Sequence, residues 1–162
     1  MKFFTLASYM KRIEETASRN EMTEILSQLF SESDADEIGN LCYLLQGRVA
    51  PLYEATEFGI ADKLMIRAIA QAYTIDASVV TQEFKKAGDL GIAAQLVLNA
   101  TATPSHSDKK LTVSAVFEQL LNLANAGGAG SQEEKITIIA NLLSHVDPLS
   151  VRYIVQIGRA HV

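Results

Sequence analysis

The segment of this chain best suited to meet a ligand is glycine-rich and runs from Gly127 to Lys135, with the sequence GGAGSQEEK. Three glycines in four residues allow positive φ angles and a close approach to the backbone. Ser131 followed by Glu134 fits the S-x-x-E capping box, which predicts a helix that starts at Ser131. The unpaired N–H groups and the positive dipole end of that helix would suit an anion such as a phosphate group, over which Lys135 could close.

The same residues also fit an ordinary, well-capped turn between two helices, and this alternative stays open. The segment does not match the nucleotide P-loop, G-x-x-x-x-G-K-[ST], or the dinucleotide pattern G-x-G-x-x-G after a strand. A nucleotide site is therefore not predicted. The candidate phosphate contacts in this segment are Gly128, Gly130, Ser131, Gln132 and Lys135.

A basic residue at a second predicted turn could extend this contact. Arg19 lies where a corner between two helices is expected, although it could equally cap helix carbonyls. The formal net charge of −5 argues against strong, non-specific nucleic-acid binding by the whole surface. Any anion-binding face must therefore be local.

No residue pattern predicts a catalytic or metal centre. The histidines, His106, His145 and His161, lack metal-ligand spacing, and one cysteine cannot complete a zinc site. That cysteine, Cys42, lies in the apolar run LCYLL, which predicts a buried small hydrophobic residue. There is also no G-x-S-x-G nucleophile elbow. We therefore expect no catalytic residue in this chain.

Apolar residues recur at helical spacing along the chain, and no stretch shows sustained β alternation. The sequence therefore predicts an all-α fold, a multi-helix bundle with short connections. The expected helices run from Phe3 to about Ser18, onward from a cap at Asn20, from Ser33 to Gly47, from Ile60 to Tyr73, from Asp76 to Ala87, from Ile92 to Leu98, from Thr112 to Gly127, onward from Ser131, and onward from Asp147-Pro148.

Composition describes a folded globular chain, with 162 residues, 48% hydrophobic and 20% charged. The segment 99–110 has few apolar residues and is the only plausible linker. It divides the chain into a first helical half, residues 1–98, and a second, incomplete half, residues 111–156. No apolar run approaches the roughly 20 residues that span a bilayer, so we expect a cytoplasmic protein with no membrane partner.

Five sequence blocks, in order and with matching spacing, resemble one known family. They run from Phe4 to Arg19, from Tyr43 to Pro51, from Gly59 to Leu64, from Lys86 to Ala94, and from Leu111 to Lys135. The chain resembles the N-terminal DNA-binding region of ATP-dependent DNA ligases of the archaeal and eukaryotic replicative type. Each block alone would be weak, but together they make the resemblance specific to about Val155.

The resemblance implies a helical clamp that grips the minor groove on both sides of a nick in duplex DNA, while catalytic domains of the same parent chain do the chemistry. It implies ATP and Mg²⁺ for the parent enzyme, in a cytoplasmic, nucleoid-associated or nuclear setting. No K-x-D-G motif occurs here, so this chain should hold no cofactor and form no enzyme–adenylate. We also expect the chain to be a monomer. The expected DNA contacts are Arg19, Gly128, Gly130, Ser131, Gln132 and Lys135.

The end of the chain departs from the family pattern. After Arg152-Tyr153-Ile154 the family continues into a short basic loop of the L-R-x-G kind, whereas this sequence ends in IGRAHV. Those six residues match a common sequencing adapter translated in one frame. We therefore expect residues 157–162 to be non-native and the natural gene to extend further.

A second function of a different class stays open from the sequence. Composition alone fits an α-helical protein-interaction module of stacked helix pairs, whereas the five blocks favour the ligase region. Salt-dependent binding to nicked duplex distinguishes the two, because phosphate contacts release counterions and a protein-binding groove does not.

Overall fold

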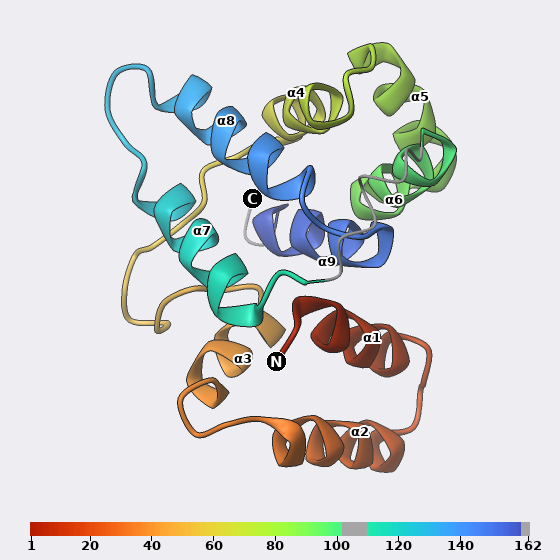
Figure 1. The fold of residues 1–162 in the computed structure, drawn as a ribbon, viewed down its shortest axis with the longest axis vertical. Coiled ribbons are helices and arrows are strands. Elements are labelled where there is room, and N and C mark those ends of the chain that lie inside the picture. Colours follow the sequence, from red (N-terminus) through yellow and green to blue (C-terminus); the bar gives the residue numbers. More distant parts are fainter. Residues whose placement is uncertain (102–109, 160–162) are drawn as a thin grey trace.

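The computed structural model describes residues 1–101 and 110–159, and across these the chain forms nine helices and no β-strand (Figure 1). The prediction of an all-α fold is confirmed. The helices are α1 (Phe3–Glu14), α2 (Arg19–Glu32), α3 (Ile38–Leu45), α4 (Asp62–Tyr73), α5 (Ala77–Ala87), α6 (Leu90–Ala100), α7 (Val113–Asn125), α8 (Ser131–Leu143) and α9 (Pro148–Arg159).

Helix α9 lies in the middle of the molecule, with α1, α6, α7 and α8 around it (Figure 1). It packs most extensively against α6 and also contacts α1. The α6–α9 contact depends on Gly91, because a Cβ added there would come within 2.5 Å of the Arg152 carbonyl oxygen. The absence of a side chain at Gly91 thus sets how closely these two helices approach.

Helices from both predicted halves share one hydrophobic core. Leu6 of α1, Met65 of α4, Leu120 of α7 and Ile154 of α9 are all fully buried and belong to one cluster. Helix α8 packs against α4, so the second half covers the first. The predicted linker falls largely on residues 102–109, outside the described part of the chain, and α6 occupies its first two positions.

Several helix boundaries follow the predicted capping residues. Asp76, Thr112 and Asp147 each accept a hydrogen bond from a backbone N–H in the first turn of the helix that follows. Gly88 ends α5 in the left-handed conformation, with φ of 74°. Local sequence chemistry therefore accounts for these ends.

The predicted corner between the first two helices is wrong in detail. Helix α1 ends at Glu14, before the expected Ser18, and α2 is capped by Ser18 and not by Asn20. The Ser18 hydroxyl accepts a hydrogen bond from the Glu21 N–H at 3.3 Å, while the Ser18 N–H donates to the Thr16 hydroxyl. These side-chain bonds compete with continuation of α1.

The predicted start of the third helix at Ser33 is also wrong. Helix α2 extends to Glu32, and α3 begins only at Ile38. The intervening turn is closed by a hydrogen bond from the Glu37 N–H to the Asp34 carbonyl at 3.0 Å. The acidic residues expected in the first turn of α3 therefore lie before it.

Five other helix ends lie two residues from the predicted positions. Helix α3 ends at Leu45, α4 begins at Asp62, α6 runs from Leu90 to Ala100, and α7 ends at Asn125. Cys42 is half-buried instead of fully buried. The earlier start of α6 has a clear cause, because the Asp89 carboxylate accepts a hydrogen bond from the Ile92 N–H at 2.8 Å.

Helix α9 continues through Arg159, whose Nε donates to Asp62 at 2.7 Å. The suggestion that residues 157–162 are non-native stays a prediction from the sequence, and residues 160–162 lie outside the described part. Among the described helices, none is both long and apolar enough to cross a membrane.

Candidate nucleic-acid interface

The glycine-rich segment connects α7 to α8, but its capping differs from the prediction. Gly130, in the left-handed conformation with φ of 79°, is the N-cap residue, and Ser131 is already the first residue of α8. No side chain caps this helix, and the Glu134 N–H donates to the Gly130 carbonyl at 3.3 Å. The S-x-x-E capping box is therefore wrong here, because the glycine takes the position that the serine was expected to fill.

The glycine-rich turn itself is open. Gly128 also has a positive φ, 88°, and a Cβ added at Gly127, Gly128 or Gly130 would meet nothing within 4 Å. The turn lines a shallow depression together with Ser131, Gln132 and Glu133. No side chain therefore fills the space next to these three glycines.

Lys135 connects this turn to a second glycine turn. Its ammonium nitrogen lies 3.5 Å from the Gly59 carbonyl oxygen, just before α4. Gly59 has a φ of 61°, and a Cβ there would come within 2.8 Å of the Lys135 nitrogen. The contact of the Lys135 ammonium group is therefore with a segment 76 residues away in sequence, and not with the turn over which it was predicted to close.

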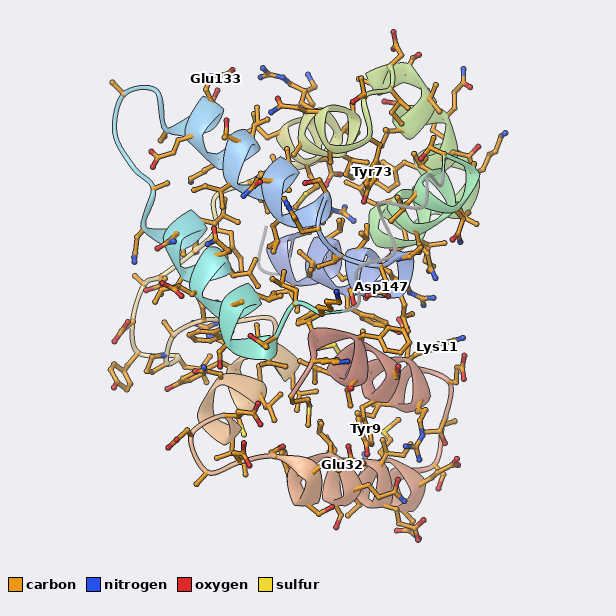
Figure 2. The ribbon with its side chains drawn as sticks, in the orientation of Figure 1. Tyr9, Lys11, Glu32, Tyr73, Glu133 and Asp147 are labelled. Atoms are coloured by element: carbon orange, nitrogen blue, oxygen red, sulfur yellow. The ribbon has the colours of Figure 1, made fainter. Side chains whose placement is uncertain are left out.

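A second cross-contact joins the same two helices. Arg67 of α4 pairs with Glu133 of α8, with 2.8 Å between Nη2 and Oε1. Both side chains are exposed, and Figure 2 shows Glu133 at the outer edge of α8. We call the region formed by Gly59, Arg67 and residues 128–135 the α4–α8 surface.

The charge on the α4–α8 surface is mixed. Glu133 and Glu134 occupy the first turn of α8, where carboxylates are favoured by the helix dipole. These two acids offset part of the positive potential that the sequence alone suggested for this helix start. The cations of this surface are Lys135, which contacts the Gly59 carbonyl, and Arg67, which pairs with Glu133.

Arg19 is not brought to the α4–α8 surface. It is exposed at the first position of α2, in the corner between α1 and α2. Figure 1 places this corner and the α7–α8 turn on opposite sides of the molecule. The predicted contacts therefore form two separate groups, one of which is Arg19 and the other Gly128, Gly130, Ser131, Gln132 and Lys135.

The chain matches the family described as DNA ligase N terminus over residues 2–160. It belongs to that family. Its relatives include a probable DNA ligase of Dictyoglomus thermophilum, 43% identical over 157 residues, a DNA ligase of Nitrosopumilus maritimus, 36% identical over 157 residues, and DNA ligase 2 of Thermofilum pendens, 37% identical over 164 residues.

These matches cover nearly all of this chain but only part of each relative. The aligned part is 97%, 97% and 96% of this chain, against 26%, 27% and 27% of the three ligases. The chain therefore spans about a quarter of the length of its relatives. It is an N-terminal ligase domain, and the resemblance inferred from the sequence blocks is confirmed.

Two of the family blocks lie at close contacts in this ligase domain. The block that begins at Gly59 forms the turn beneath Lys135, and the block that contains Gly88 and Gly91 turns the chain from α5 into α6 and against α9. The sequence marks Gly59 as part of a block but gives no sign of its contact with Lys135. It gives no sign of Arg67 either, because an arginine on an exposed helix face carries no local signal.

The described residues hold no group of three or more His, Cys, Asp or Glu side chains placed for a metal ion. His145 lies 2.6 Å from the Asn141 carbonyl through its Nδ1, at the end of α8. This contact ties the ring to the helix end. His106 and His161 lie outside the described residues.

Proposed function

We propose that this chain is the non-catalytic DNA-binding domain of an ATP-dependent DNA ligase, which grips duplex DNA around a nick while separate domains of the same parent chain seal it. The observation that carries the proposal is the family match over residues 2–160, together with relatives four times as long that are named DNA ligases. In this proposal the domain serves DNA replication and repair, at the nucleoid or in the nucleus, where the full-length ligase binds DNA.

The α4–α8 surface supplies groups that suit a phosphate backbone. Its glycine turn leaves backbone groups open, and Lys135 adds a cation next to it. Contacts of this type position a protein on a duplex without reading its sequence. Arg19, on the other side of the molecule, is in this proposal a second contact, separate from the α4–α8 surface.

ATP and Mg²⁺ belong in this proposal to the rest of the parent enzyme. The nucleophilic lysine of the K-x-D-G motif is not part of this sequence. No chemical step is therefore assigned to this domain, whose role is to bind and position the nicked duplex as a single copy.

The test is the binding of nicked duplex by the 162-residue chain over a range of salt concentrations. Lys135→Ala should weaken binding about equally for all DNA sequences and flatten the slope of log affinity against log salt by about one unit, because one phosphate contact is lost. Lys86→Ala is the matched control, since Lys86 lies at the end of α5 beside Glu83. It should leave the slope unchanged.

If Lys135→Ala binds duplex with the same affinity and salt slope as the unmutated 162-residue chain, the glycine turn is only a connection between helices. Absence of any salt-dependent duplex binding would favour the alternative, an α-helical protein-interaction module.

A further inference from the structure

We propose that Glu133 is a built-in competitor for DNA: it holds Arg67 in the free domain, and Arg67 exchanges this carboxylate for a backbone phosphate when duplex binds. This inference rests on the proposed function. It adds Arg67 as a further DNA-binding residue and gives the α4–α8 surface a means of moderating its own affinity.

The Arg67–Glu133 ion pair is short, but both of its side chains are exposed to solvent. Its atoms are 2.8 Å apart, yet the arginine side chain is 52% exposed and the glutamate side chain 71% exposed. Ion pairs with this exposure are screened by water and salt, so they hold their partners weakly. The guanidinium can therefore change partner without disturbing the fold.

A phosphate is a suitable replacement for the carboxylate. An arginine guanidinium presents a planar fork of N–H donors that fits carboxylate and phosphate oxygens alike. Glu133 contacts Arg67 directly, whereas Lys135, two residues further along α8, points to another side of the helix and contacts Gly59. Lys63 is exposed one helical turn before Arg67 on α4 and extends the same cationic face.

Packing between α4 and α8 does not require the pair. The two helices pack against each other, and each carries fully or nearly fully buried apolar side chains, among them Met65 and Ile69 on α4 and Ile136 and Ile139 on α8. These residues belong to the common core. An exposed ion pair at the rim adds little to such a contact, which leaves its side chains available for another role.

The inference predicts that the effect of Glu133→Gln on duplex affinity depends on whether Arg67 is present. Glu133→Gln should tighten nicked-duplex binding about two- to fivefold at low salt, because it frees Arg67 and removes a negative charge near the phosphates. In the R67A background the same substitution should tighten binding less, since only the repulsion is then removed.

The complementary arm measures Arg67 directly. Arg67→Ala should weaken binding more in the E133Q background than in the unmutated chain. In the E133Q background it should also flatten the salt slope by about one unit, the signature of one lost phosphate contact. Thermal unfolding of each variant checks that the fold is retained.

The pair Lys86–Glu83 of α5 gives a control cycle, because Lys86→Ala and Glu83→Gln make similar charge changes at a surface pair, whose side chains are 74% and 32% exposed. This cycle should show no coupling. Equal tightening by Glu133→Gln in both backgrounds would overturn the inference, because the glutamate would then act by repulsion alone. If the Arg67–Glu133 cycle shows no coupling but Lys135→Ala still weakens duplex binding, only this inference is removed. If the unmutated 162-residue chain fails to bind duplex, the proposed function is removed as well.

Discussion

At the scale of single residues, two glycines of this domain are needed for different physical reasons. Gly91 is required for space, because a Cβ there would collide with the backbone of α9. Gly130 has open space around it, and its requirement comes from a φ of 79°, which other L-residues adopt only with strain. Sequence shows a glycine in both cases but cannot distinguish the two causes.

Gly130→Val tests the requirement for positive φ. A β-branched residue at this angle should destabilise the domain by about 1–3 kcal/mol. It should also weaken duplex binding by more than the stability loss explains, because the side chain would stand in the open turn. Gly127→Val is the control, since Gly127 has no neighbour within 4 Å and is not among the positive-φ glycines. Urea unfolding and duplex titration measure both effects, and equal results for the two variants would contradict the argument.

Contacts between residues that are far apart in the chain could not be predicted from the sequence. The Lys135–Gly59 contact joins residues 76 apart, and Arg67 meets Glu133 across 66. Helical periodicity reports which face of a helix is buried, but it carries no information about which helices become neighbours. The candidate site could therefore be predicted as a local turn but not as a surface shared by two helices.

At the scale of helices, prediction succeeded where one strong signal was present. Capping residues such as Asp76, Thr112 and Asp147 fixed their helix starts because each offers an acceptor to the first turn. It failed where polar side chains offered competing bonds, as at Ser18 and Glu37. The S-x-x-E pattern illustrates this, because its serine caps a helix at Ser18 but not at Ser131.

Leu120→Ala tests the packing of α7. Leu120 is fully buried, so the substitution should lower the free energy of unfolding by about 2–5 kcal/mol through lost burial and a cavity. Leu96→Ala on α6 is the matched control, because Leu96 is 47% exposed and its loss should cost far less. Urea unfolding measures both. Similar small losses would mean that α7 is not packed as described.

At the scale of the whole molecule, the first residues of the chain fasten segments that are distant in sequence. The Phe3 N–H donates to the Leu111 carbonyl at 2.9 Å, and the Val113 N–H donates to the Met1 carbonyl at 2.9 Å. The N-terminal amine pairs with Glu37, just before α3. These contacts and the shared core connect segments from both predicted halves, and no local pattern in the sequence indicates that connection.

Glu37→Gln tests this connection through its pH dependence. A hydrogen bond from the N-terminal amine, and then one from the Asp34 N–H, lower the pKa of Glu37 below its ordinary value. A carboxyl whose pKa is lower in the folded chain stabilises the fold above its unfolded pKa, and this contribution is lost as pH falls through the folded pKa. Glu37→Gln should therefore clearly reduce the free energy of unfolding at about pH 7. The reduction should be much smaller at about pH 3, because the Glu37 carboxyl of the unmutated chain is then largely neutral as well. Urea unfolding at both pH values measures the difference, with Glu24→Gln on the exposed face of α2 as the control. A deficit of the same size at both pH values would show that Glu37 contributes through packing and not through its charge.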